Sequence, residues 1–168
     1  MLNLVHNLET RTLLCNDPKF LETLVKMGLR HNGDVNIQYM VAATMDVITK
    51  KKDFAKKVLE TPDSVECLIQ LCAFKMNDDV IAEAARALFN LVSLEEKKCR
   101  EVLMTAGVVQ VLQLISKNKP IEVRMPALDG LSVLTNNEDK IKQLEGEYGL
   151  DFAYGVIEEK KQEGDGED

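Results

Sequence analysis

Two histidines, four cysteines and several neighbouring carboxylates are the residues of this sequence that first suggest catalysis or metal binding. His6 lies near the start of the chain and His31 in an expected loop, and neither belongs to a motif with a nucleophile and a base. Carboxylates such as Glu95 and Glu96 are adjacent in an expected helix, so they point to different sides of it. The sequence therefore predicts no catalytic site, and we expect a protein that is not an enzyme.

The cysteines are spaced as buried thiols and not as metal ligands. Cys15, Cys67, Cys72 and Cys99 lack the CxxC or Cys/His spacing of a zinc site, and Cys67 and Cys72 stand among apolar neighbours. The glycines form no phosphate-binding or dinucleotide-binding spacing. We therefore expect reduced, buried thiols, no metal and no cofactor.

Composition favours a helical protein whose partners are other proteins. Aromatic residues make up 5% of the chain and Trp is absent, which favours helices over a sheet rich in aromatic and β-branched residues. The net charge of -7 does not suit nucleic acid, because phosphate binding needs clustered Lys and Arg. No apolar run reaches the roughly 20 residues of a membrane span, and the start lacks the basic region of a signal peptide. We expect a cytoplasmic location, with the nucleus as an alternative.

Apolar residues recur at a spacing of 43 along the chain, which predicts a repeat protein. Leu2 and Val5 begin two such series, at the place where the end of an earlier repeat belongs. In the later copies the apolar residues are spaced i, i+4, i+8 and i+11, on one face of a helix. The three stretches with this spacing are Ile37-Val41-Met45-Ile48, Val80-Ala84-Leu88-Leu91 and Val123-Ala127-Leu131-Leu134.

Each repeat is expected to contain a short helix, a second helix and a longer third helix. Matching apolar positions predict second helices over 65–72 and 108–115, and short helices are expected over 53–60 and 95–105. The connections at 32–34, 77–78 and 118–120 contain the Asn and Asp residues typical of helix N-caps. Because one such unit cannot bury its own apolar face, the copies must stack.

The sequence therefore predicts an all-α protein, a right-handed α-solenoid of about three repeats with partial repeats at its ends. The expected domain covers residues 1–160, with repeats at roughly 7–50, 51–94 and 95–137 and a partial repeat at 138–160. Residues 161–168 are acidic and contain glycine, which is typical of a disordered tail. We expect the last helix to cap the C-terminal end and the N-terminal end to continue into a longer repeat array.

The three-helix unit, the period of 43 and third helices such as Ala84-Ala85-Arg86-Ala87-Leu88-Phe89-Asn90-Leu91 resemble armadillo repeats, over the chain up to about residue 157. In armadillo proteins that hold extended peptides, such as importin-alpha and beta-catenin, the third helices line a concave groove, where an exposed Asn pairs with the peptide backbone. By this resemblance Asn90 takes the Asn position and Arg86 takes the place of the importin Trp. The equivalent residues of the neighbouring repeats do not match, so the resemblance does not imply binding of nuclear-signal peptides.

The predicted partner-binding surface is therefore mixed, with a Met and Val stripe and a few charges. Such a stripe suits an apolar helix or a folded domain better than a polybasic peptide. Two simpler interpretations stay open: the apolar members pack on the adjacent second helices, and Asn90 is a solvated polar residue. The surface comprises Met40, Ala43, Val47, Glu83, Arg86, Asn90, Asp129 and Val133.

Two further expectations concern the third helices themselves. Pro126 lies six residues into its helix, where it removes a hydrogen bond, so we expect a kink or a late start of that helix. Arg86 and Asn90 stand one turn apart on the expected exposed side. Replacing both with Ala is expected to change stability by no more than roughly 0.5 kcal/mol.

The leading functional hypothesis is a non-enzymatic adaptor whose concave face binds a protein segment or domain. An alternative is a chaperone cofactor, because some short armadillo proteins promote nucleotide exchange on a heat-shock chaperone and related ones fold myosin heads. A third is an enzyme regulator in which this module docks onto further repeats through its N-terminal face. Binding of a folded ATPase domain, of peptides or of other repeats distinguishes the three.

Overall fold

The structure is a computed structural model that describes residues 2–31, 33–74, 77–94, 102–103 and 107–134. The expected capping helix, the acidic tail and most of the short helix over 95–105 lie outside the described residues. Within these residues every regular element is a helix. The elements are α1 (Leu2–His6), α2 (Leu8–Asn16), α3 (Pro18–Arg30), α4 (Val35–Thr49), α5 (Lys52–Glu60), α6 (Ser64–Cys72), α7 (Asp78–Val92), α9 (Val108–Asn118) and α10 (Ile121–Leu134).

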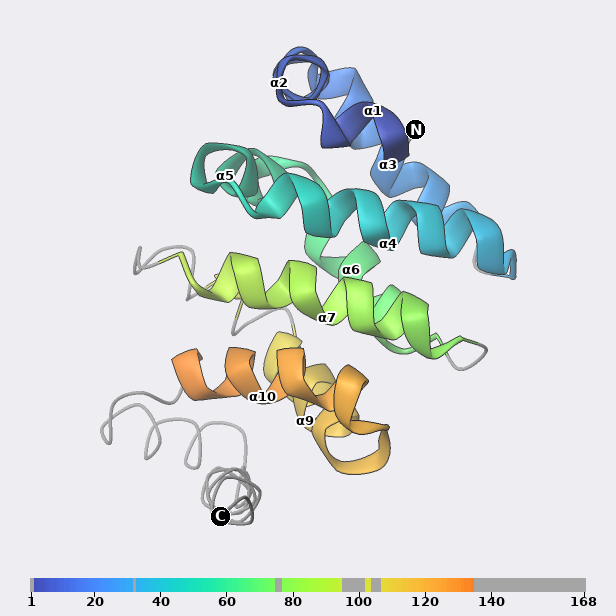
Figure 1. Cartoon of the computed structure of the whole chain (residues 1–168), viewed down its shortest axis with the longest axis vertical. Coiled ribbons are helices and arrows are strands. Elements are labelled where there is room, and N and C mark those ends of the chain that lie inside the picture. Colours follow the sequence, from blue (N-terminus) through green and yellow to red (C-terminus); the bar gives the residue numbers. More distant parts are fainter. Residues whose placement is uncertain (1, 32, 75–76, 95–101, 104–106, 135–168) are drawn as a thin grey trace.

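The helices stack in chain order into one elongated body (Figure 1). The three long helices α4, α7 and α10 lie side by side in one layer, since α4 packs against α7 and α7 against α10. A second layer supports them, because α3 packs on α4, α6 on α7 and α9 on α10. The predicted all-α solenoid is confirmed. We call the surface formed by α4, α7 and α10 the third-helix face.

The apolar series found in the sequence forms the core between the layers. All four residues of the α7 series and all four of the α10 series are buried, as are Val41, Met45 and Ile48 of α4. Ile37 is half-buried and packs against this core. The 43-residue spacing therefore places the same helix position in the same packing environment from one repeat to the next.

Two of the expected N-caps are present. The Asp34 carboxylate accepts hydrogen bonds from the backbone N–H groups of Asn36 and Ile37, at 2.9 and 3.1 Å, and starts α4. The Asn77 side chain does the same at the start of α7. The third connection differs, because Asn118 is the last residue of α9 and the Pro120 carbonyl accepts the first backbone hydrogen bonds of α10.

Helix α10 begins at Ile121 and continues through Pro126 to Leu134. Of the two expected consequences of Pro126, the late helix start is therefore wrong, and the kink stays a prediction. The proline removes one backbone donor from the ladder, and burial of its ring and of the residues after it keeps the helix continuous.

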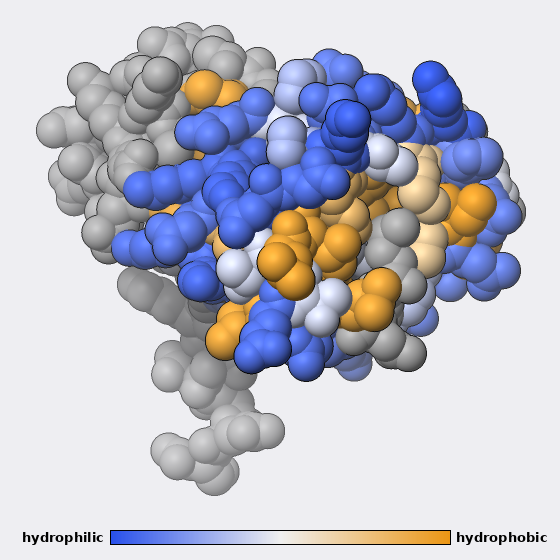
Figure 2. Space-filling model, turned by 90° about the horizontal axis from the view of Figure 1, so that it is seen from above, coloured by the Kyte–Doolittle hydropathy of each residue, from blue (hydrophilic) through white to orange (hydrophobic). Residues whose placement is uncertain are grey.

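The N-terminal end of the stack exposes several apolar side chains. Leu4, Leu8 and Leu13 have 53%, 56% and 73% of their surfaces accessible. Viewed from this end, apolar residues form separate groups among hydrophilic ones (Figure 2). Docking onto further repeats through this end stays a prediction.

Candidate functional site

A hollow of about 300 Å³ lies on the third-helix face, where α4, α7 and α10 meet. Each helix contributes side chains to it, so the hollow exists only because three repeats are stacked. Its exposed wall is mostly apolar, with charged and amide groups at the margin. The lining residues are Asp46, Lys50, Arg86, Phe89, Asn90, Met125, Pro126 and Asp129.

Asn90 joins two repeats at this hollow. Its Nδ2 donates to the backbone carbonyl of Asp46 at 3.4 Å, to the Asp46 carboxylate at 3.3 Å and to the Thr49 hydroxyl at 3.1 Å. The carbonyls of the last helical turn lack partners within the helix, so these bonds help to satisfy the C-terminal end of α4. Arg11 serves the same end of α4, because its Nη1 donates to the carbonyl of Val47 at 3.3 Å.

These bonds contradict the alternative interpretation of Asn90 as only a solvated polar residue. The amide group holds α7 against α4, so replacing Asn90 removes an inter-repeat contact as well as a surface group. The small stability effect expected for the double replacement with Ala therefore does not apply to Asn90.

The charged groups around the hollow are paired with one another. Lys50 Nζ lies 2.7 Å from the Asp46 carboxylate, and Arg86 Nη2 lies 2.5 Å from the Glu83 carboxylate. Asp129 also has an interaction partner. The lining contains two negative charges, on Asp46 and Asp129, and two positive charges, on Lys50 and Arg86. It therefore carries no net charge.

The structure brings three of the predicted surface residues together at the hollow: Arg86, Asn90 and Asp129. Glu83 contributes indirectly through its ion pair with Arg86. Met40 is half-buried outside the hollow, and Val133 is half-buried against the core.

Ala43 and Val47 are buried, with 4% and 7% of their surfaces accessible, so they are not part of an open partner surface. They lie on α4, against which α1 packs. The interpretation of these two residues as partner contacts is therefore wrong in this structure. Burial of Val47 and packing of the half-buried Val133 against the core agree with the simpler interpretation in so far as both residues pack within the protein, whereas packing on the second helices stays a prediction.

Sequence reasoning missed Asp46, Lys50, Phe89 and Met125, and treated Pro126 only as a perturbation of its helix. It followed one strip of residues, spaced three and four apart, along each third helix and did not extend the strip to its neighbours. Residues three positions away lie on the same side of a helix, and Phe89 stands three positions after Arg86. A helical wheel drawn around Arg86 and Asp129 would have placed Phe89, Met125 and Pro126 on the same side of their helices as these two residues.

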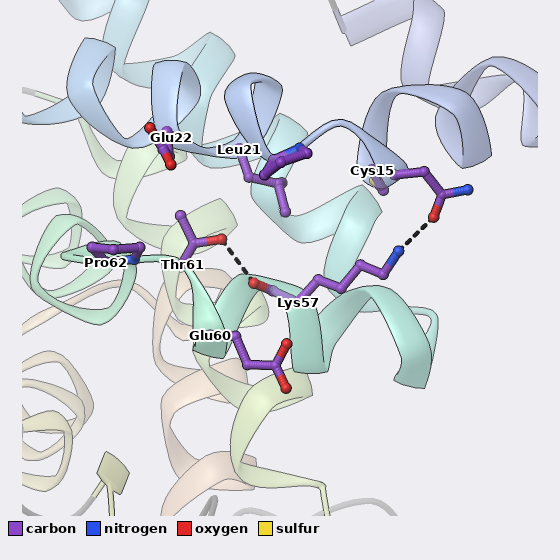
Figure 3. Close-up of a pocket in the computed structure, with 9 residues that line it drawn as sticks. Cys15, Leu21, Glu22, Lys57, Glu60, Thr61 and Pro62 are labelled. Atoms are coloured by element: carbon purple, nitrogen blue, oxygen red, sulfur yellow. Dashed lines mark hydrogen bonds between the residues drawn. The ribbon is translucent and has the colours of Figure 1, made fainter.

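A second hollow, of about 290 Å³, lies between the α2–α3 segment and α5 (Figure 3). Lys57 extends across it and donates a hydrogen bond to the Asn16 side chain, while the Thr61 hydroxyl donates to the Lys57 carbonyl at 2.7 Å. Cys15 also lines this hollow. Burial raises the pKa of the Cys15 thiol, and the charges of Arg11 and Lys57 lower it by less. The thiol is therefore neutral near pH 7 and is a poor nucleophile.

The other described cysteines are also free and buried, as expected from the sequence, whereas Cys99 lies outside the described residues. Burial raises the pKa of the Cys67 thiol from 9.0 to about 12, and the Glu66 carboxylate adds to the shift. Burial likewise raises the pKa of the Cys72 thiol. In the part of the chain that the structure describes, no group of three or more His, Cys, Asp or Glu residues is arranged to hold a metal ion.

The raised pKa of Cys67 predicts a loss of stability at alkaline pH. Above pH 9 the unfolded chain releases the thiol proton while the folded protein retains it, so the free energy of unfolding falls between pH 9 and about 12. From pH 8 to pH 10 we expect the wild type to lose about 1 kcal/mol more than Cys67→Ala. Urea unfolding with a reducing agent measures this difference, and parallel pH dependences of the two proteins contradict it.

Among the described helices, none combines the length and the apolar character needed to cross a membrane.

Solved structures similar to this chain include engineered and designed proteins. One is described as a computationally designed armadillo repeat protein for modular peptide recognition, with a TM-score of 0.78 and 20% sequence identity over 94% of this chain. Another is described as an engineered protein, with a TM-score of 0.67 and 24% identity over 84% of this chain. The present chain spans 63% and 54% of the lengths of these two proteins.

No family model and no curated protein matches the sequence. The structural likeness shows the fold, and the chain has an armadillo-like repeat fold. The resemblance inferred from the 43-residue period is thus confirmed at the level of the fold.

Proposed function

We propose that this protein is a non-enzymatic interaction module that binds a protein segment along the third-helix face. The observation that carries the proposal is the hollow at the meeting of α4, α7 and α10. It is open at the surface, it is built from three repeats, and it combines an apolar wall with polar groups at the margin, as binding sites for peptides and other ligands do. The designed armadillo protein that shares the fold is described as made for peptide recognition, which supports this choice.

Arg86 is the residue best suited to test the proposal. It lines the hollow, its side chain is 39% accessible, and its interaction with Glu83 stays within α7. Replacing it with Ala removes a margin group whose partner Glu83 is 17% accessible, and we expect a cost of about 1 kcal/mol, near the upper end for ion pairs at the surface. Asn90 is less suitable, since it also holds α7 against α4.

The test begins with selection of binders from a phage-displayed library of random dodecapeptides on the immobilised full chain. Dissociation constants of the enriched peptides are then measured by fluorescence polarisation. We expect Arg86→Ala to weaken binding about tenfold, the size of a typical interface contact. The matched control is Lys26→Ala, which removes an exposed cation of α3 that pairs with Glu22 and lies outside the hollow.

The control is expected to bind like the wild type. Equal binding by both variants, or a selection that enriches no peptide, contradicts the proposed site. A loss of no more than about 1 kcal/mol in the urea unfolding of Arg86→Ala ensures that weaker binding reflects the surface and not the fold.

A further inference from the structure

We infer that the hollow on the third-helix face takes an apolar side chain of the bound segment and selects against a charged one. This inference rests on the proposed function and adds the chemical class of the residue that anchors the partner. It is carried by the apolar lining, by the pairing of the surrounding charges and by the size of the hollow.

The apolar lining comes from two helices. Phe89 of α7 is half-buried, Pro126 of α10 is buried, and Met125 of α10 keeps 38% of its surface accessible beside them. Pro126 contributes a ring and has no backbone N–H, so it adds apolar surface and no donor. Methionine adapts its shape to different apolar partners. The three side chains together form a surface that gains from being covered by apolar atoms.

The charges at the margin do not favour a cationic or an anionic anchor. The Asp46 side chain is only 5% accessible, and its carboxylate already interacts with Lys50 and Asn90. Arg86 is paired with Glu83, and Asp129 has an interaction partner of its own. A lysine or arginine entering the hollow must give up water and compete with these existing pairs, whereas an aliphatic or aromatic side chain only displaces water.

The charge of the whole chain agrees with this local pairing. Residues 1–134 contain 17 acidic and 17 basic residues, so the net charge of -7 comes from residues 135–168. The region that contains the hollow therefore provides no net field to attract a polybasic or a polyacidic peptide. A volume of about 300 Å³ lies at the lower end of the range of ligand pockets, which suits a side chain better than a cofactor.

The experiment uses synthetic fluorescein-labelled nonapeptide pools, in which the central residue is fixed and the other positions are randomised. Binding of each pool to the full chain is measured by fluorescence polarisation. We expect the pools fixed as Leu, Ile, Met or Phe to bind at least tenfold more tightly than those fixed as Lys, Arg, Asp or Glu. Met125→Glu is expected to remove this preference and Met125→Leu to preserve it.

Leu114→Glu is the matched control, because Leu114 is 58% accessible on α9 and does not line the hollow. This variant is expected to keep the apolar preference. Tightest binding by the Lys or Arg pools, or equal binding by all pools, overturns the apolar anchor and leaves the proposed function standing. Failure of every pool to bind overturns both. A preference that survives Met125→Glu in a folded protein also overturns the inference, because the anchor then binds elsewhere.

Discussion

Replacing Gln38 with Leu is expected to lower the free energy of unfolding by about 2 kcal/mol, although the new residue is of similar size and more apolar. Gln38 is 2% accessible, and its Nε2 donates to the carbonyls of Gly28 and His31, each at 2.8 Å. Both carbonyls belong to the C-terminal end of α3, where helical carbonyls lack donors from within the helix; the His31 carbonyl also accepts from the Asp34 backbone N–H at 3.1 Å. Leucine leaves the buried Gly28 carbonyl without the amide, whereas the His31 carbonyl keeps the Asp34 N–H, and an unmet buried polar group costs about 1–3 kcal/mol.

Urea unfolding monitored by circular dichroism measures the change for Gln38→Leu. The matched control is Gln70→Leu, the same chemical change at an exposed position, where Gln70 donates only to Glu66 within α6. We expect the control to stay within about 0.5 kcal/mol of the wild type. A loss below 1 kcal/mol for Gln38→Leu would show that the amide does not tie α3 to α4.

The position of Gln38 in its repeat shows how much of this fold the sequence alone could predict. A step of 43 places Gln38, Ile81 and Arg124 at equivalent points of α4, α7 and α10. Ile81 is 1% accessible, as the apolar pattern requires, but Gln38 is equally buried. Periodicity reports which side of a helix faces inward. It does not report that the end of α3 brings two carbonyls to Gln38, because that depends on how two helices end in space.

The candidate site shows the same limit. The sequence singled out Arg86, Asn90 and Asp129, which the structure places together at the hollow. It did not reveal that Asn90 reaches back to Asp46 and Thr49 of the previous repeat, 44 and 41 residues earlier. Contacts between repeats depend on side-chain direction and on the stacking distance, and neither is encoded in a pattern of apolar residues.

Gly28→Ala is expected to destabilise the protein by about 2 kcal/mol, against the usual trend for helices. Gly28 lies inside α3, where alanine is ordinarily favoured by about 1 kcal/mol. Here a Cβ would stand 2.5 Å from Cys67 Sγ of α6 and 3.2 Å from Val41 Cγ1 of α4. Both neighbours are buried, so they have little room to move. Overpacking a core costs about 1–3 kcal/mol, which outweighs the gain in helix propensity when α3 is pushed away from two helices at once.

A control variant and a rescue variant test whether the contact with Cys67 causes the destabilisation. Gly33→Ala makes the same change where no atom lies within 4 Å of the new Cβ, so we expect stability within about 0.5 kcal/mol of the wild type. Adding Cys67→Ala to Gly28→Ala removes the sulfur that the new methyl group meets. The double variant is then expected to be more stable than Gly28→Ala, because two residues in contact do not act additively. Thermal unfolding of the wild type, the two single glycine variants and the double variant tests this. A double variant less stable than Gly28→Ala would show that the sulfur is not the obstacle and that the backbone of α3 limits the packing.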